Sequence, residues 1–380
     1  FFSPREKQEK SKMKTIRNLY TLKITARLIA ALLVSTLVLS LSATAMALTT
    51  YSIIELGAAN CAVSSINDYA DVVGQCDAVA AVWENGVATS LGKLPKGTYS
   101  VAHAVNSHGV AVGWGDAGDG RPRAELYRNG TVSDIDPSAA NAYAIYVNDR
   151  GVIAGNALKG FGPCNNWVAA IYTEDTSKPG TFRRTDLQPY PGGDGKSRCE
   201  WATAANQSVQ VAGWVQNSLF GQKGAFWNND SKHTLSLLEP LPNDWSSLAW
   251  GMNDLGQAVG ESHPPFSSRP VLWDNDGTHT AIELPLLPDD NYGSAAAVNN
   301  LGHVLGSSAY STPGTWNVGP SRLVIWRDGG VFELQSLLDP LAGWTITSVS
   351  GAAINNVGQI VGSGLHNGQT AQFVMTPVAP

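Results

Sequence analysis

The sequence predicts an all-β fold: a seven-bladed β-propeller of four-stranded antiparallel blades, with the ring closed by the N-terminal strand. Three observations predict it. A strand–turn–strand signature recurs seven times, further strand patterns follow each copy, and the strand missing from the last copy lies at the other end of the chain. The composition agrees, because only 15% of the 380 residues are charged and 39 are glycine. Low charge with many aromatic residues excludes a disordered or nucleic-acid-binding chain, and abundant glycine with β-branched residues argues against a helical bundle.

An asparagine followed seven residues later by a glycine marks the first two strands of each repeat. An apolar residue precedes the asparagine, and a small residue lies before that in six of the seven copies, with Tyr146 as the exception. Asparagine accepts hydrogen bonds from a turn backbone and glycine adopts positive φ, so the signature predicts strand, tight turn and strand. The seven pairs are Asn67/Gly74, Asn106/Gly113, Asn148/Gly155, Asn206/Gly213, Asn253/Gly260, Asn299/Gly306 and Asn355/Gly362.

A third and a fourth strand are predicted after each signature. The third ends in an aromatic residue followed by turn residues such as Asn85-Gly86, which is typical of a hairpin. The fourth ends in a polar–apolar pair in six copies, and the seventh copy lacks it. Residues 51–56 end in the same kind of pair, Glu55-Leu56. We therefore expect residues 51–56 to pair with the strand near residues 372–375, closing the ring and leaving only short strand edges.

The segment before the repeats predicts an export signal. A basic stretch from Met13 is followed by residues 28–41, which carry no charge, and then by small residues ending at Ala47. We expect residues 1–12 to lie upstream of the true start, 13–47 to be a signal peptide cleaved after Ala47 or Ala45, and 48–380 to form a single propeller domain. The alternative is an uncleaved membrane anchor, because residues 28–48 are long enough to span a bilayer.

Charge and localisation follow from that cleavage. Residues 1–47 hold eight basic and two acidic residues, so their removal takes the net charge from −6 to −12. An acidic protein does not attract phosphate backbones or anionic lipid. We expect a secreted or periplasmic monomer with no nucleic-acid partner, no membrane span after cleavage, and a glycan, protein or peptide as its ligand.

The repeat resembles the extracellular HAF-repeat family. The shared order is small–Ile–Asn-x-x-Gly-x-x-x-Gly, aliphatic–Trp, Asn-Gly and acidic–Leu–Gly over residues 50–376, most clearly at 105–113, 252–260 and 354–362. The His-Ala-Phe of the family name is absent, and Ala225-Phe226-Trp227 is its nearest form. The resemblance implies an exported bacterial protein of largely unassigned role, and it brings no catalytic residues.

The four cysteines predict disulfides in an exported chain. Cys61 and Cys76 lie nearly opposite each other across one predicted hairpin, within bridging reach. Cys164 and Cys199 fall in connections that leave the same face, so they can also meet. The alternative is a zinc site, but the Cys-x2-Cys spacing is absent. We expect the disulfides Cys61–Cys76 and Cys164–Cys199, and no metal.

The longest connections predict where a ligand binds. Residues 156–168, 188–200, 261–270, 285–293 and 307–321 all join second to third or fourth to first strands, which places them on one face. Function concentrates in loops on a rigid scaffold, and aromatic side chains suit carbohydrate or peptide contact. The alternative for Trp114 and Trp214 is packing between blades. The predicted ligand-binding residues, around the axial channel mouth, are Trp114, Phe161, Trp167, Trp214, Glu261, His263 and Trp316.

No catalytic motif accompanies this face. Seven histidines are scattered without metal-ligand spacing, and no nucleophile-elbow, zinc-protease or phosphate-loop motif occurs. We therefore expect an exported non-catalytic binding or scaffold propeller, without cofactor or catalytic residues. One alternative is a carbohydrate-active, glycosidase-like enzyme with carboxylates from different blades, and the acids best placed for it are Asp116, Asp119, Glu200 and Glu261. A structural cell-envelope protein is the other.

Overall fold

The regular secondary structure of the described residues is almost entirely β-strand. The computed structural model describes residues 50–57, 60–160, 166–190, 199–216 and 221–378. The predicted signal segment, Phe161 and Cys164 lie outside these described residues. Besides strands, turns and loops, the described residues include the short 3-10 helices η2 (Leu334–Leu337) and η3 (Pro340–Ala342) and a 3-10 residue at Asn166.

The strands follow one another in sets of four, as the repeat predicts. In chain order they are β1 (Thr50–Leu56), β2 (Cys61–Ile66), β3 (Val72–Cys76), β4 (Val79–Glu84), β5 (Val87–Gly92), β6 (Ser100–Val105), β7 (Ala111–Gly115), β8 (Arg123–Arg128), β9 (Thr131–Asp134), β10 (Ala142–Val147), β11 (Ile153–Leu158), β12 (Trp167–Glu174), β13 (Phe182–Asp186), β14 (Cys199–Ala205), β15 (Val211–Gln216), β16 (Gln222–Trp227), β17 (Leu235–Leu238), β18 (Ser246–Met252), β19 (Ala258–His263), β20 (Arg269–Trp273), β21 (Ala281–Glu283), β22 (Tyr292–Val298), β23 (Val304–Ala309), β24 (Arg322–Arg327), β25 (Gly330–Glu333), β26 (Trp344–Ile354), β27 (Ile360–His366) and β28 (Gln369–Val378).

Each four-strand set pairs antiparallel in sequence order, from β2–β5 to β22–β25. Single parallel pairs, Ser65 with Ala352 and Trp167 with Cys199, join two neighbouring sets each. The hydrogen-bonded strands therefore make two eight-stranded and three four-stranded sheets. The prediction of an all-β fold built from four-stranded antiparallel sheets is confirmed. The hydrogen bonds alone do not define seven separate blades, because the two parallel pairs each join two neighbouring sets into one sheet.

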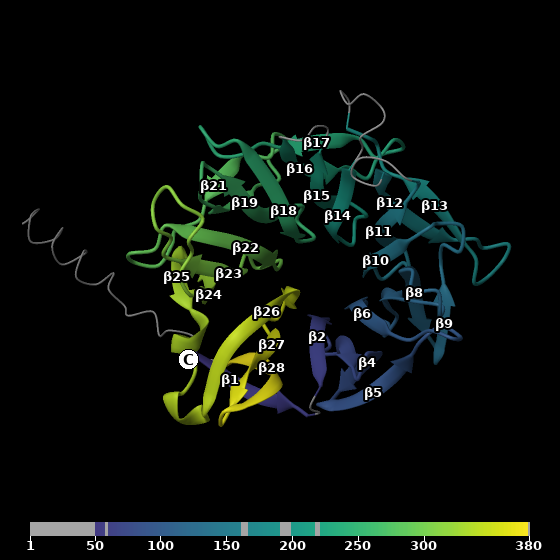
Figure 1. Ribbon diagram of the computed structural model, residues 1–380, viewed down its shortest axis with the longest axis horizontal. Coiled ribbons are helices and arrows are strands. Elements are labelled where there is room, and N and C mark those ends of the chain that lie inside the picture. The colour runs from purple at the N-terminus through teal and green to yellow at the C-terminus, as the bar shows by residue number, and fades with distance from the viewer. Residues whose placement is uncertain (1–49, 58–59, 161–165, 191–198, 217–220, 379–380) are drawn as a thin grey trace, which may run out of the picture. The chain divides into compact units, whose positions relative to one another are not determined.

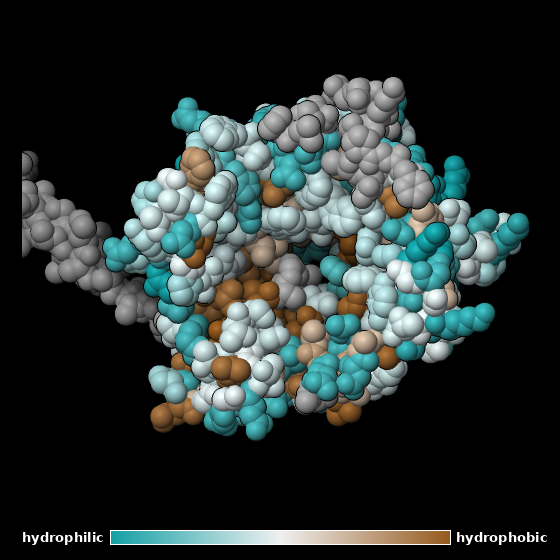
Figure 2. All heavy atoms as spheres, viewed as in Figure 1, coloured by the Kyte–Doolittle hydropathy of each residue, from teal (hydrophilic) through white to brown (hydrophobic). Residues whose placement is uncertain are grey.

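The first strands of the sets surround a common centre. In Figure 1, β2, β6, β10, β14, β18, β22 and β26 all face it. A cavity of about 530 Å³ occupies this centre, lined by residues of all seven first strands or the turns that follow them, and Figure 2 shows the molecule hollowed there. Strand direction alternates within a set, so the second-to-third and fourth-to-first connections leave the end opposite the asparagine turns. We call that end the long-loop face.

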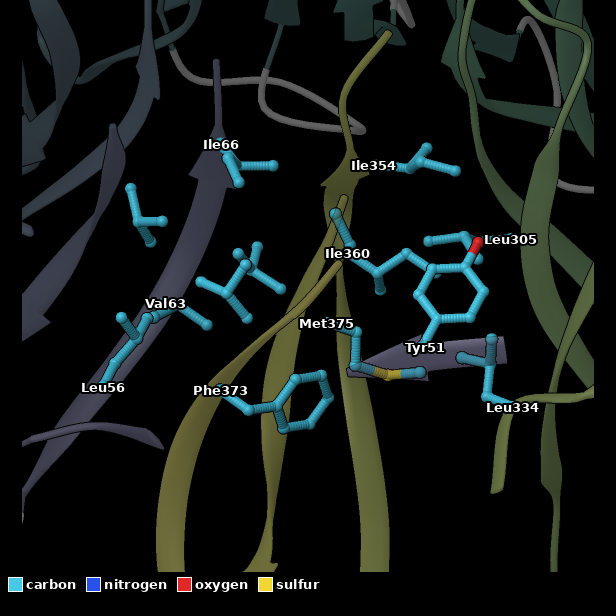
Figure 3. Close-up of a cluster of buried hydrophobic side chains, with 14 of the residues drawn as sticks. Tyr51, Leu56, Val63, Ile66, Leu305, Leu334, Ile354, Ile360, Phe373 and Met375 are labelled. Atoms are coloured by element: carbon cyan, nitrogen blue, oxygen red, sulfur yellow. The ribbon is translucent and has the colours of Figure 1, made fainter. Parts of the chain in front are cut away.

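The N-terminal strand completes the last set. β1 pairs antiparallel with β28, with Ile53 opposite Met375 and Leu56 opposite Gln372. This is the pairing expected from the missing fourth strand. Tyr51 and Leu56 are buried in the same hydrophobic cluster as Phe373 and Met375 (Figure 3). Burial of apolar side chains from both ends of the chain therefore holds β1 in place.

The repeated asparagine does more than build its turn. The Asn67 side-chain oxygen accepts the backbone N–H groups of Tyr69 (3.0 Å) and Asp71 (2.9 Å), as expected for a turn. Its Nδ2 donates to the backbone oxygen of Asn106 in the next set, at 2.9 Å. Equivalent links run from Asn106 to Asn148, Asn148 to Gln207, Asn206 to Asn253, Asn253 to Asn299, Asn299 to Asn355, and Asn355 back to Asn67.

The two glycine positions of the signature serve different purposes. Gly109 adopts positive φ (71°) in its turn, whereas Val209 occupies the equivalent position with φ 62°. The second glycine is needed for close approach, because a Cβ on Gly113 would lie 1.9 Å from the backbone oxygen of Val101. Backbone sterics therefore require glycine at the second position and favour it at the first.

Candidate functional site

Six aromatic rings form a continuous cluster at the long-loop end of the cavity. Successive ring centroids lie 5.0 to 6.5 Å apart. Such separations are typical of favourable edge-to-face and offset aromatic contacts. We call this cluster the aromatic array, and it consists of Tyr99, Trp114, Tyr143, Trp167, Trp201 and Trp214.

The aromatic array is placed by repeat geometry. Trp114 and Trp214 directly follow the second glycine of their repeats, near the ends of β7 and β15. Tyr143 and Trp201 lie opposite such positions, near the starts of the first strands β10 and β14. All six side chains are half-buried. Trp114, Tyr143 and Trp201 line the cavity, so the array is packed on one side and open on the other.

The array answers the question left open for Trp114 and Trp214. Trp214 stacks on Trp201 (interplanar angle 20°) and does not itself line the cavity, so the packing alternative describes it well. Trp114 packs edge-on against Tyr99 and Tyr143 and also faces the cavity. A ligand in the cavity mouth would therefore touch Trp114, whereas Trp214 would support the ring of Trp201, on which it stacks.

Glu261 and His263 form a second element of the site. Glu261 follows the second glycine of its repeat, the same position that Trp114 and Trp214 hold in theirs. Its Oε2 lies 3.2 Å from His263 Nε2, and the two side chains are 18% and 22% exposed. They lie two residues apart on β19, so they project on the same side of the strand. The structure thus brings two of the predicted residues together.

The surroundings of Glu261 keep it ionised. Burial raises the pKa of its carboxyl, but the side chains of His263, Ser294 and Trp250 outweigh burial and hold the pKa below its ordinary value. Trp250 also lines the cavity. Glu261 is therefore a carboxylate at neutral pH, and one of its hydrogen-bond partners, Trp250, belongs to the cavity wall.

The other three acids named for a catalytic alternative have local structural partners. Burial raises the pKa of the Asp116 carboxyl, but N–H groups of Tyr99, Thr98 and Gly118 outweigh it and hold the pKa at about 2. Asp119 pairs with Arg123 at 2.6 Å. Glu200 is buried and accepts a hydrogen bond from the Tyr190 backbone. Glu261 has a hydrogen-bond partner, Trp250, that lines the cavity.

Several predicted residues lie elsewhere than expected. Trp167, Glu261 and His263 were expected in loops, but β12 and β19 extend far enough to include them. Trp316 is 67% exposed and contacts Phe266 rather than the aromatic array. Phe161 lies outside the described residues.

Sequence reasoning missed Tyr99, Tyr143, Trp201 and Trp250. Tyr143 and Trp201 both lie five residues before the repeated asparagine. An aromatic residue at this shared position was the sequence signal that could have identified both as site residues.

The disulfide predictions are met in part. Cys61 and Cys76 form a disulfide and lie opposite each other in the β2–β3 ladder. Cys199 is disulfide-bonded as well, but Cys164 lies outside the described residues, so that pairing stays a prediction. In the described ranges, no group of three or more His, Cys, Asp or Glu side chains is arranged to hold a metal ion. No helix in this part of the chain is long and apolar enough to cross a membrane.

No family model matches the chain, and no curated protein matches it. Solved structures do match. A prolyl endopeptidase is similar over 88% of this chain at 11% identity and TM-score 0.50, and the chain spans 51% of it, about half its length. An oligogalacturonate lyase in complex with manganese is similar over 87% of this chain and 94% of its own, at 12% identity and TM-score 0.51. The β-propeller domain of the Trilobed protease from Pyrococcus furiosus is similar over 85% and 99%, at 10% identity and TM-score 0.48.

Together with the four-stranded antiparallel sets around a common centre, the likeness to the prolyl endopeptidase and the lyase defines an all-β fold of the propeller kind, and at such identities it shows the fold alone. They also correct the functional prediction. The prolyl endopeptidase and the lyase are enzymes, so the expectation of an exported non-catalytic binding or scaffold propeller is wrong as the main interpretation.

Proposed function

We propose that this chain is an exported, carbohydrate-active enzyme that cleaves a glycosidic bond at the long-loop mouth of its axial cavity. The observation that carries the proposal is the contact of one open cavity with both the aromatic array and Trp250, the partner of the Glu261 carboxylate. Aromatic faces pack against the C–H faces of sugar rings, and carboxylates transfer protons during glycoside cleavage. The two features together suit a glycan better than a peptide.

Each residue has a role in this proposal. Trp114, Tyr143 and Trp201 bind sugar rings, because they face the cavity from three successive four-strand sets. Glu261 accepts a proton from the water that attacks the anomeric carbon, and a proton returns through His263 beside it to the glycosidic oxygen as the bond from that oxygen to the anomeric carbon breaks. Trp250 fixes the Glu261 carboxylate at the cavity wall. The oligogalacturonate lyase, which this chain matches over 94% of the lyase's own length, is an enzyme named for acting on a carbohydrate. This supports the view that a fold of this size suffices for such an enzyme.

The architecture proposed for this enzyme is a closed ring of seven blades. Support comes from the seven asparagine links, the last of which joins Asn355 to Asn67 across 288 residues at 2.9 Å, and from the β1–β28 pairing. Membership in the HAF-repeat family and export by a cleaved signal at Ala47 belong to the same proposal. The Cys61–Cys76 disulfide supports an oxidising compartment, where such bonds persist.

The test is an activity screen of residues 48–380 on defined polysaccharides, with the release of reducing ends as the measurement. We expect wild-type protein to cleave at least one glycan and Glu261→Gln to lose activity by about 100-fold or more, as for removal of a proton-transfer group. Glu283→Gln is the matched control, because Glu283 is an exposed glutamate of the same set, on β21. Equal activity of Glu261→Gln and Glu283→Gln would contradict the assignment.

A further inference from the structure

Phe266 and Trp316 form an exposed aromatic pair on the long-loop face. Their ring centroids lie 5.7 Å apart, and the residues are 46% and 67% exposed. Phe266 lies between β19 and β20, and Trp316 lies in the equivalent connection between β23 and β24 of the next set. Two contacting rings left this far in water offer apolar surface that folding does not use.

One residue, Asn291, fixes both loops. The Ser267 hydroxyl donates to the Asn291 backbone oxygen at 3.0 Å. The Asn291 side chain donates to the Ser311 oxygen at 2.9 Å and accepts the Ser311 N–H at 2.6 Å. The loop with Trp316 is closed on itself as well, since the Gly319 N–H donates to the Tyr310 oxygen at 2.9 Å. The pair is therefore held ready for a ligand, which lowers the ordering cost of binding.

The pair continues directly from the proposed catalytic residues. His263 is the last residue of β19, and Phe266 follows it three positions later. The chain thus runs from Glu261 and His263, near the cavity-lining Trp250, into the loop that holds Phe266, and Phe266 contacts Trp316 of the next set. A short sugar would fill the cavity mouth and leave the outer rings unused. A longer chain would contact both.

We propose that Phe266 and Trp316 form an outlying subsite for a polysaccharide, holding the part of the chain that extends beyond the cavity mouth. The inference rests on the proposed function and adds to it the substrate class, a polymer. A glycan fits this surface because a pair of aromatic rings between polar loops matches the alternating apolar faces and hydroxyl edges of sugars. A protein partner would require a larger interface, of about 800 Å² per side.

The experiment compares Phe266→Ala/Trp316→Ala with Trp245→Ala. Trp245 is the matched control, because it is 69% exposed and precedes the first strand β18, in another connection of the same face. Binding is measured by co-sedimentation with insoluble cellulose, chitin and cross-linked pectin, with Glu261→Gln added to all proteins to prevent turnover. Turnover is measured separately on a soluble polysaccharide and on short oligosaccharides of the same linkage.

We expect the double variant to lose retention on the polymer by about tenfold or more and to show a raised KM for the polysaccharide. Its turnover of the short oligosaccharide should match that of the wild type. Unchanged retention, equal loss with Trp245→Ala, or wild-type protein that none of these polymers retains would overturn the subsite. Retention that depends on the pair, in a protein that cleaves no glycan, would instead refute the enzymatic function and leave the subsite standing.

Discussion

Glu125 makes the stability of this protein depend on pH in a direction that can be worked out. Its side chain is fully buried on β8, where the Tyr127 hydroxyl donates to it, and burial raises the pKa of its carboxyl from 4.5 to about 7. The unfolded chain therefore loses this proton at a lower pH than the folded protein does. The contribution of Glu125 to stability is complete below pH 4.5 and is lost as the pH rises through 7.

The magnitude follows from the shift. A difference of one pKa unit corresponds to about 1.4 kcal/mol, so the loss between pH 4.5 and pH 8 is about 3 kcal/mol. Glu125→Gln keeps an oxygen for Tyr127 and removes the ionisation. We expect the variant to lack this part of the pH dependence. The free energy of unfolding of the variant minus that of the wild type should therefore be larger at pH 8 than at pH 4.

The assay is urea unfolding of both proteins from pH 4 to pH 8, with the free energy of unfolding as the measured quantity. Glu84→Gln serves as the control, because Glu84 is an exposed glutamate at the end of β4. Parallel curves for wild type and Glu125→Gln over this pH range would refute the argument. They would mean that the carboxyl is hydrated, or that the fold relaxes around it.

Three further predictions concern the ring and its repeats. Deletion of residues 48–57 should lower the melting temperature, measured by calorimetry, by more than 10 °C, because β28 loses its partner strand and the cluster around Phe373 loses Tyr51 and Leu56. An unchanged melting temperature would contradict the stabilising role of the β1–β28 pairing. Val209→Gly should raise the free energy of unfolding by about 1 kcal/mol, because a β-branched residue is strained at φ 62°; a loss of stability in urea titration would oppose this. Non-reducing peptide mapping should yield Cys61–Cys76 and Cys164–Cys199, and a peptide joining Cys61 to Cys164 would disprove the predicted pairing.

The repeat signature was sufficient to predict the strands and their order. Its turns, spacing and missing last strand are local properties, and the β1–β28 pairing follows from them. Cys61 and Cys76 were predictable in the same way, because they flank one hairpin at nearly equal distances. The Glu261–His263 pair was within reach too, since residues two apart on a strand share a side.

The rest of the site depends on irregularities that a sequence pattern does not display. A register shift falls inside the first strand of each repeat, as between Ala144 and Tyr146 or between Ala202 and Ala204. Such a bulge breaks the two-residue alternation, so the sequence does not tell which residues face the cavity. Tyr143, Trp201 and Trp250 were missed for that reason. The links between neighbouring asparagines were missed because they join different repeats.

The most direct test of the account is a crystal structure of Glu261→Gln with an oligosaccharide of the glycan that the wild type cleaves. The account predicts sugar rings packed against Trp114, Tyr143 and Trp201, with a glycosidic bond beside position 261. An oligosaccharide bound away from the cavity mouth, or in the mouth with no glycosidic bond near position 261, would contradict the proposed active site.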